Sequence, residues 1–396
     1  MKQRLGAWFD ERLSWRHLWK KYATHYDVPK NLNFYYLFGS LALLVLFNQL
    51  LTGVWLTFFY TPTTQDAFDS IQFIMRDVPY GWLLRTLHST GASLFFVVMY
   101  LHIFRGLLYG SYQKPREFVW LLGMVLYLLL IAEAFFGYLL PWGQLSYWGA
   151  EVITSLLGSI PYVGDGLMMW IRGDYAISDV TLHRFFAYHV IFIPLFLIVY
   201  VVLHLVALRT VGSNNPEGID IDLNDTVPFH PYYTLTDAIG AVGFLMVFLS
   251  IVFFFPSMGG FFLDPMNLEP ANPFVTPEHI HPLWYMSPFY AILRAVPYKA
   301  FGILVMSSAI MLLFLMPWLD KSPVRSMRYK GAASKVSLYL FVLSFGALGI
   351  LGMLDVSVFR IQITRIAMVF YFAYFFLMPW ITRCESHRVV PTRITL

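Results

Sequence analysis

The chain of 396 residues is 58% apolar and only 13% charged, and its mean hydropathy is +0.61. Soluble proteins carry roughly 25% charged residues, so this composition excludes a soluble globular domain and a disordered chain. The single cysteine, Cys384, excludes a disulfide framework, a thiolate metal site and a covalently attached haem, which needs a Cys-x-x-Cys-His motif. We therefore predict an all-α integral membrane protein without a nucleic-acid partner, in which any metal is bound by histidine.

Residues 1–33 are polar and charged, and they lack the short apolar core and small cleavage residues of a signal peptide. We expect them to form an amphipathic cytoplasmic segment. Eight apolar runs that follow are each long enough to cross about 30 Å of hydrocarbon as a helix. They cover residues 34–59, 81–107, 118–140, 181–208, 235–255, 289–319, 335–354 and 363–381.

The orientation of these spans follows from their basic residues. Most of the 27 Lys and Arg precede the first span or lie in connections on that same side of the membrane. The positive-inside rule therefore places both termini in the cytoplasm of a multi-pass membrane protein.

Two connections on the opposite, outer side are too long to be simple turns, and long loops often carry function. Residues 141–180 alternate apolar and polar side chains, which predicts short helices in the membrane interface. Residues 256–288 are rich in Pro and Gly. We divide the spans into a four-helix unit, 34–209, and a C-terminal unit, 210–396.

Four histidines lie in register on two spans. His88 and His102 are fourteen residues apart on the second span, and His189 and His204 are fifteen apart on the fourth. Four helical turns take about 14.4 residues, so each pair shares one face with about 21 Å between its members. A metal–nitrogen bond is only about 2 Å long, so each metal needs one ligand from each helix. The two spans are parallel, which pairs His88 with His189 near the outer face and His102 with His204 near the inner face.

Two imidazoles on opposite sides of one iron in an apolar slot are typical of b-type haem, which is held without covalent links. A single buried histidine is more often a hydrogen-bonded packing residue, but four in register favour two haems. His183 lies six residues before His189 and points to another side, so we reject it as a ligand. His17, His25 and His387 lie in polar tails.

Paired glycines on the neighbouring spans support the same two depths. Gly39 and Gly53 on the first span, and Gly123 and Gly137 on the third, are again fourteen residues apart. Glycine leaves room where a flat macrocycle approaches the backbone, although membrane helices also use it for tight packing. These spans run antiparallel to the histidine spans, which places Gly53 and Gly137 at the outer haem and the other two at the inner haem.

Two arginines on the second span are candidates for binding haem propionates. Arg85 lies three residues before His88, and Arg105 lies three residues after His102. The alternative is that both are ordinary arginines whose charged ends reach the membrane surface.

At this point the sequence resembles cytochrome b of the respiratory quinol:cytochrome c oxidoreductase, of bacterial type, over nearly its full length. The motifs that carry the resemblance are R-T-L-H-S-T-G-A-S at 85–93, G-Y-L-L-P-W-G-Q-L-S-Y-W-G-A at 137–150, T-L-H-R-F-F-A-Y-H at 181–189, V-G-S-N-N-P at 211–216 and P-L-W-Y at 282–285. The resemblance implies a low-potential outer haem, a high-potential inner haem and two quinone sites.

In that family, quinol is oxidised at the outer site. One electron goes to a Rieske iron–sulfur protein, and the other crosses the two haems and reduces quinone at the inner site. The resemblance further implies ubiquinone as substrate, a cytochrome c1 subunit, a homodimeric complex that translocates protons, and the bacterial inner membrane.

By the same resemblance, the outer quinol site contains Tyr138, Gly149, Ile153 and the segment Pro282, Trp284 and Tyr285. Leu283 stands where the family motif P-E-W-Y usually has a glutamate, and leucine cannot accept a proton.

The carboxylates at the same depth are Glu133, Glu151 and Glu278. We hypothesise that Glu151 or Glu133 replaces the missing acceptor, because an intramembrane carboxylate is a functional candidate by default. Glu151 is slightly preferred because it is close to Gly149, whereas Glu278 lies in a polar loop.

The resemblance assigns Asp237, Arg209 and Ser213 to the inner quinone site. Read alone, Asp237 is a carboxylate that caps the start of the fifth span. Arg209 stands where the respiratory family commonly has histidine, and an arginine binds a quinone oxygen but does not release a proton. This feature resembles the photosynthetic counterpart, whereas the unsplit chain favours the respiratory type.

Two other functions remain open. A haem-free transporter also has Gly- and Pro-rich spans, but it explains neither the histidine register nor the paired glycines. A simpler dihaem electron conduit with one quinone site leaves the long outer connections without a role.

Overall fold

The computed structural model describes residues 8, 11–12, 14 and 26–394. Among these residues, seven helical segments are long and apolar enough to cross a membrane. They are η2 (Phe34–Tyr36) with α3 (Leu37–Thr57), α5 (Gly81–Tyr109), α6 (Glu117–Leu139), α9 (Asp179–Ala187) with η3 (Tyr188–Phe192) and α10 (Ile193–Val211), α11 (Phe229–Phe254), α15 (Ala332–Met353) and α16 (Val358–Cys384). The predicted all-α membrane fold is confirmed. The expected segment 1–33 lies largely outside the described residues.

The predicted span 289–319 is not one helix. It is divided into α12 (Ser287–Ala295), α13 (Lys299–Phe314) and α14 (Met316–Leu319). Val296 is extended, as a residue before proline usually is, and Pro297 follows it. Hydropathy alone does not register this break. The crossing candidate is therefore α13 with α14, which together extend about 30 Å, while α12 is a buried helix that packs against α15.

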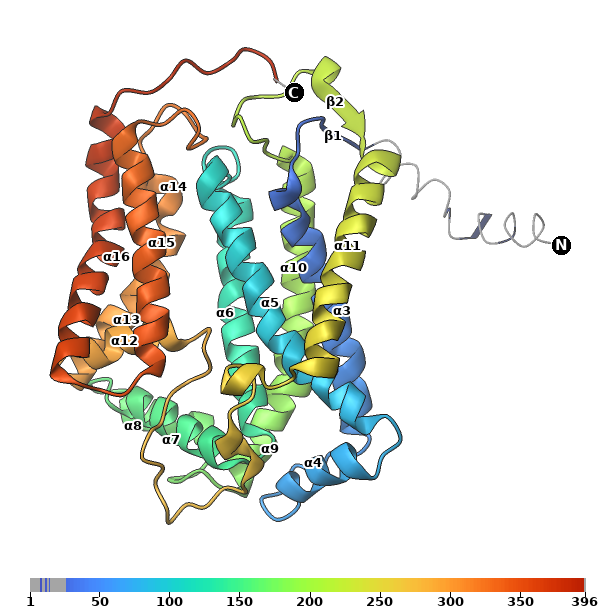
Figure 1. The fold of residues 1–396 in the computed structure, drawn as a ribbon, viewed down its shortest axis with the longest axis vertical. Helices are drawn as coiled ribbons and strands as arrows, with labels where there is room; N and C mark the ends of the chain where they lie inside the picture. Colours follow the sequence, from blue (N-terminus) through green and yellow to red (C-terminus); the bar gives the residue numbers. More distant parts are fainter. Residues whose placement is uncertain (1–7, 9–10, 13, 15–25, 395–396) are drawn as a thin grey trace.

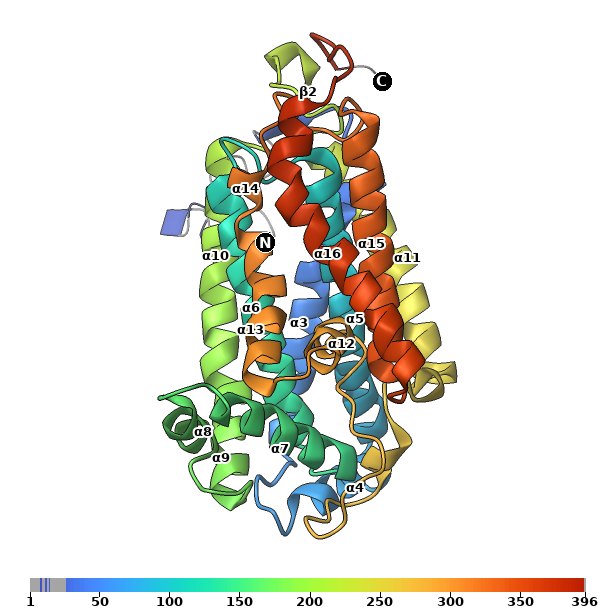
Figure 2. The ribbon, with the colours of Figure 1, turned by 90° about the vertical axis from the view of Figure 1, so that its left-hand side faces the viewer.

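The two ends of the bundle differ in structure. At one end lie α4 (Ala67–Arg76), α7 (Gln144–Gly158) and α8 (Gly164–Arg172), together with α9 (Figures 1 and 2). The helices α7 and α8 occupy the connection that was expected to form short helices, whereas α4 was not anticipated. At the opposite end, β1 (Asp27–Pro29) pairs antiparallel with β2 (Thr226–Pro228). Short 3-10 turns complete the loops: η4 (Leu223–Asp225), η5 (Met258–Gly260) and η6 (Pro265–Leu268).

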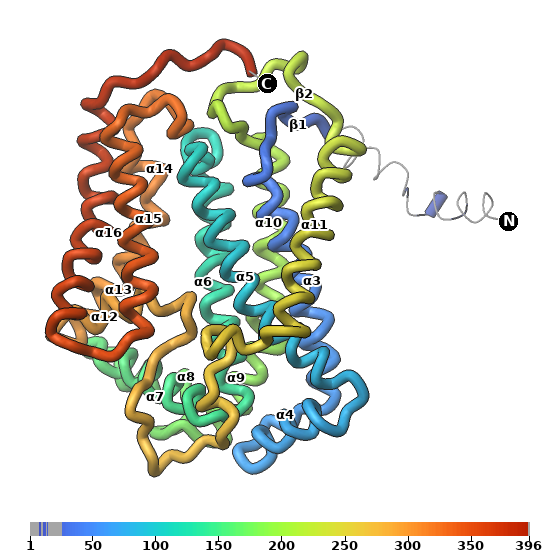
Figure 3. The backbone as a smooth tube through the Cα atoms, viewed as in Figure 1, coloured from blue at the N-terminus to red at the C-terminus, as the bar shows by residue number. Residues whose placement is uncertain are grey.

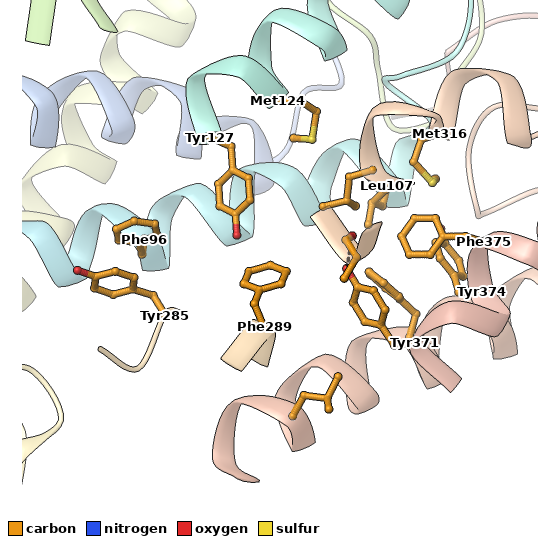
Figure 4. Packing of buried hydrophobic residues seen from close by; sticks show 14 of the residues in the cluster. Phe96, Leu107, Met124, Tyr127, Tyr285, Phe289, Met316, Tyr371, Tyr374 and Phe375 are labelled. Atoms are coloured by element: carbon orange, nitrogen blue, oxygen red, sulfur yellow. Dashed lines mark hydrogen bonds between the residues drawn. The ribbon is translucent and has the colours of Figure 1, made fainter. Parts of the chain in front are cut away.

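The four helices α3, α5, α6 and α10 form the central bundle, in which α3 packs on α5 and α6 packs on α10. The pair α15 and α16 lies on one side of this bundle and α11 on the other, as the backbone trace in Figure 3 shows. A continuous aromatic core joins the bundle to α12 and α16 (Figure 4). In it, the ring of Tyr285 stacks on that of Phe96, with 3.7 Å between the ring centroids.

Buried carboxylates hold the strand end of the molecule together, and that of Asp225 joins three of its segments. Its Oδ1 accepts hydrogen bonds from Lys30 Nζ at 2.9 Å and from Arg393 Nη2 at 2.9 Å. The two cations hold the pKa of Asp225 well below its usual range. Three segments far apart in the sequence therefore meet at this end of the bundle.

We expect Asp225→Asn to release the segment around Arg393, because a neutral amide cannot hold two cations as a carboxylate does. Limited trypsin digestion at neutral pH checks this, with several-fold faster cleavage after Arg388 and Arg393 as the expected result. Asp222→Asn is the matched control, because among the described residues the Asp222 carboxylate accepts hydrogen bonds from Asn224 and acts on Arg393 only through its charge, without a hydrogen bond. Equal cleavage rates for the two variants would contradict the assignment.

Candidate functional site

The structure brings the four spaced histidines together as two pairs at two depths. His88 on α5 faces His189 in η3, with ring centroids 6.0 Å apart and ring planes at 86°. His102 on α5 faces His204 on α10, with centroids 6.4 Å apart and planes at 65°. His183 is exposed and bonds to Asp179 instead.

These distances fit an iron atom between each pair. A metal–nitrogen bond is about 2.0–2.1 Å and a ring centre lies about 1.1 Å beyond its nitrogen, so imidazoles on opposite sides of one metal have centres about 6.3 Å apart. Among the described residues, no three His, Cys, Asp or Glu side chains gather to hold a bare ion. Two protein ligands suffice for haem, because the macrocycle supplies the other four nitrogens.

His189 and His204 are fifteen residues apart, which is more than four regular helical turns need. A π turn beside His189 allows both side chains to lie on the same face of the helix. Residues Tyr188–Phe192 form this turn, in which Ile193 N donates to Tyr188 O. One extra residue is absorbed there, as is usual for π-bulges at functional sites. Pro194 follows directly and has no N–H to donate in a regular helix. The unequal spacing and this proline are the only sequence signals of the turn.

Each of the four paired glycines lies against a histidine ring of the adjacent helix. A Cβ at three of them would lie 3.2–3.4 Å from Cε1 of the ring: Gly39 against His102, Gly53 against His88 and Gly123 against His204. At Gly137 it would lie 2.7 Å from Nδ1 of His189, which is too close for any side chain. The glycines lie at the predicted depths, and each of them leaves room for a histidine ring.

The two histidine pairs differ in what their Nδ1 atoms contact. His88 Nδ1 lies 2.9 Å from Thr52 Oγ1. His189 Nδ1 lies 2.9 Å from the backbone oxygen of Glu133 and 3.0 Å from Glu133 Oε1. Within the described part of the chain, Nδ1 of His102 is buried without a hydrogen-bond partner, whereas His204 interacts with the backbone oxygen of Val119. The sequence analysis missed Thr52, whose position beside Gly53 was the available signal.

The outer cavity is continuous with the outer histidine pair. Its walls include Arg85, Glu133, Tyr138, Leu283 and Tyr285.

Of the other residues predicted for the outer quinol site, Gly149 lies against the Tyr138 ring. Trp284 donates to Ser93 Oγ at 3.3 Å and stacks on Phe261 and Phe262. Pro282 and Ile153 are not among the residues that line the cavity. Asn267 was missed; its amide donates to the Tyr138 hydroxyl at 2.8 Å.

The structure does not support the preference for Glu151 as a proton acceptor. Its Oε1 accepts from Arg172 Nη2 at 2.9 Å and from Ser155 Oγ at 3.1 Å, and it does not line the outer cavity. Sequence reasoning missed Arg172 because its contact with Glu151 comes from the separate helix α8. Glu278 is exposed in the loop. Glu133 lines the cavity, but its carboxylate contacts His189.

The inner cavity surrounds the second histidine pair and contains Arg105, Arg209, Ser213 and Asp237. Asp237 lies well inside α11, so its interpretation as a cap at the start of the helix is wrong. Its Oδ2 accepts from Ser40 Oγ at 2.7 Å, a partner that the sequence did not indicate. The Arg209 guanidinium lies 4.3 Å from the centre of the Tyr26 ring.

Arg105 has donor capacity left over for an anion in this cavity. Its Nη1 donates to Ser111 Oγ at 3.3 Å, and its guanidinium lies over the Tyr36 ring. Among the described residues, its buried Nε has no hydrogen-bond partner. A haem propionate beside His102 would satisfy this donor.

Comparison with known proteins agrees with this architecture. Residues 23–212 match the family model Cytochrome b/b6/petB, and residues 270–372 match Cytochrome b(C-terminal)/b6/petD. The chain is 52% identical to a cytochrome b of Allochromatium vinosum, over 98% of each chain. It is 48% identical to a cytochrome b of Rhodospirillum rubrum, over 98% of this chain and 95% of that protein.

A solved structure titled "Hyperthermophilic respiratory Complex III" contains a chain of the same fold. The TM-score is 0.91 at 40% sequence identity, covering 96% of this chain and 99% of the other. Two family models in sequence order, relatives matched over nearly their whole length and the shared fold lead to one conclusion. The chain belongs to the cytochrome b family.

Proposed function

We propose that the chain is the dihaem membrane subunit of a proton-translocating quinol:cytochrome c oxidoreductase. The observation that carries this proposal is the presence of two cavities at two depths of one bundle, each joined to a histidine pair at the spacing for one iron. His88 and His189 would hold a low-potential haem, and His102 and His204 a high-potential haem. When bound, the haems supply one-electron carriers between the cavities.

The outer cavity would bind ubiquinol. The Tyr138 hydroxyl accepts a hydrogen bond from Asn267, which leaves its own hydrogen to donate to a quinol oxygen. Leu283 and Tyr285 provide apolar walls, and the stacking of Tyr285 on Phe96 fixes that wall. A Rieske iron–sulfur protein would take one electron here and pass it to a cytochrome c1 subunit within a homodimeric complex.

The inner cavity would bind ubiquinone. Arg209 would donate a hydrogen bond to one quinone oxygen. Asp237 lines the same cavity, is oriented by a hydrogen bond from Ser40, and would carry the proton. Ser213 adds a further polar group. The end with β1 and β2 would face the cytoplasm of a bacterial inner membrane, because most basic residues lie near it.

The assignment of the histidines is tested by removing one ligand at a time. We expect His204→Leu to lose the inner haem and quinone reduction while keeping the outer haem. Leucine cannot bind iron, so His102 would be the only protein ligand left at the inner site. Redox titration of purified membranes, followed by optical absorbance, resolves the two b-type components. His183→Leu is the control and should keep both. Two unchanged components in His204→Leu would contradict the proposal.

Leu283 allows a gain-of-function test of the outer site. We expect Leu283→Glu to raise the rate of quinol oxidation at neutral pH at least several-fold, because a general base typically contributes 10²–10⁴-fold. The measurement is quinol-dependent cytochrome c reduction by the purified complex across pH. Leu283→Gln has the same size without a base and should not gain activity. An equal change in both variants would show that proton acceptance is not limiting at this position.

The loop over the outer cavity carries a pair that predicts a pH effect. His281 Nε2 lies 3.4 Å from Asp264 Oδ2, and Leu263 and Leu283 of the same loop line the cavity. The hydrogen bond with Asp264 raises the pKa of His281, although burial and, to a smaller extent, Arg294 oppose it, and the same hydrogen bond lowers the pKa of Asp264. A raised histidine pKa stabilises the fold below about pH 6.5 and ceases to do so as the pH rises through the raised value.

We therefore expect amide hydrogen exchange of residues 256–286 to accelerate as the pH rises through that range, beyond the intrinsic pH dependence of exchange. In His281→Gln the excess acceleration should vanish, leaving the loop loose at every pH. If the variant kept the pH dependence of the parent protein, the pair would not be what holds the loop.

A further inference from the structure

One apolar residue on each helix of the central bundle lies midway between the two histidine pairs. On α5, Phe95 is seven residues from both His88 and His102. The corresponding leucines of α3 and α6 are each seven residues from the two paired glycines of their helix, and that of α10 is eight residues after one histidine and seven before the other. Seven residues make about two turns, or about 10.5 Å along the axis. The four residues at this depth are Leu46 on α3, Phe95 on α5, Leu130 on α6 and Leu197 on α10.

These four residues also form the boundary between the two cavities. They are the only described residues that line both the outer and the inner cavity. All four are buried, and Leu197 is the only buried residue of α10 in the described chain. A single layer of side chains, one from each helix, therefore separates the two cavities. We call this layer the septum.

The septum offers water no hydrogen-bonding partner, because its side chains are pure hydrocarbon. On the outer side, polar side chains come within one turn of it: Gln49 and Glu133 both line the outer cavity. On the inner side, the cavity wall one turn away is still apolar, and includes Leu43, Met99, Leu126 and Val201. Buried water needs two to four polar partners, and even a cavity of about 150 Å³ stays dry when its walls are apolar. We therefore expect no water to cross this layer.

We propose that the septum is a proton barrier, which keeps the outer and the inner cavity from being joined by water while electrons cross between them. This inference rests on the proposed function, in which protons leave on the outer side and enter on the inner side. A chain of water between the cavities would let protons return without doing work. The haems, when bound, supply the electron carriers on either side of the layer, and the septum residues exclude water between them.

The test measures passive proton entry into sealed phospholipid vesicles that contain the purified complex and an internal pH-sensitive dye. An external acid pulse is applied without quinol, in the presence of K⁺ and valinomycin so that no charge accumulates. We expect Phe95→Ser to raise the rate of internal acidification at least several-fold, because serine leaves room for water and adds a hydroxyl that binds it. Phe95→Leu leaves room without a polar group and should stay as tight as the parent complex.

Phe375→Ser is the matched control for a polar residue in the core. Phe375 is fully buried in the same aromatic core as Phe95 but lines neither cavity. A leak of the same size in this variant would reflect general loosening of the protein and would overturn the proposal. An equal leak in Phe95→Leu would overturn it too, as would an unchanged rate in Phe95→Ser with both b-type components present in the optical spectrum.

If Phe95→Ser does not retain both b-type components, Leu130→Asn repeats the test with a side chain of similar size. Its control is Leu122→Asn on the same helix, because Leu122 is buried but lines neither cavity. A leak confined to Leu130→Asn supports the proposal. No leak, or the same leak in both variants, overturns it.

The measurement requires no quinol turnover, so it separates this inference from the proposed function. A leak that is specific to the septum variants, in a complex that does not oxidise quinol, would support the barrier and count against the function. Tight septum variants of a complex that does oxidise quinol would overturn the barrier alone.

Discussion

The structure depends on one constraint, which is that two imidazoles from different helices must face each other across about 6 Å at two depths of the same bundle. Helical periodicity determines the two depths at which the histidines lie. The close packing of α3 on α5 and of α6 on α10 determines which faces of the two histidine helices are turned toward the bundle interior. A glycine lies behind every ring: a Cβ would be in tight contact with the ring at Gly39, Gly53 and Gly123, and it would not fit at Gly137. The π turn at His189 satisfies the same requirement where the spacing is one residue too long.

The two cavities acquire their roles from this arrangement. Each shares walls with one histidine pair, so in the proposed function a quinone bound there would lie beside an electron carrier, without a long path through protein. Both cavities have mainly apolar walls with a few polar side chains. These are Arg105, Arg209, Ser213 and Asp237 in the inner cavity, and Arg85, Glu133, Tyr138 and Asn267 in the outer one. The C-terminal helices contribute through the aromatic core, which fixes Tyr285 and hence one wall of the outer cavity.

Much of the site was accessible from the sequence because it is periodic. The pairing of His88 with His189 and the depth of Gly137 follow from residue spacing along rigid helices. The predictions that were wrong concerned contacts between segments distant in the sequence, or local interruptions of a helix. Hydropathy did not register the interruption at Pro297, and no pattern revealed that Arg172 of α8 neutralises Glu151. The start of α11 was placed too late, so the alternative interpretation of Asp237 as a helix cap was wrong. The contact of Glu133 with His189 joins two helices through a side chain that was a candidate proton acceptor for quinol because of its intramembrane position.

The most direct test of the account is the haem content of the purified polypeptide, measured by the pyridine haemochrome spectrum against the protein concentration. The histidine geometry predicts two b-type haems per chain, both extractable into acid acetone because no cysteine motif attaches them. A single haem per chain, or haem that stays with the protein after extraction, would contradict it.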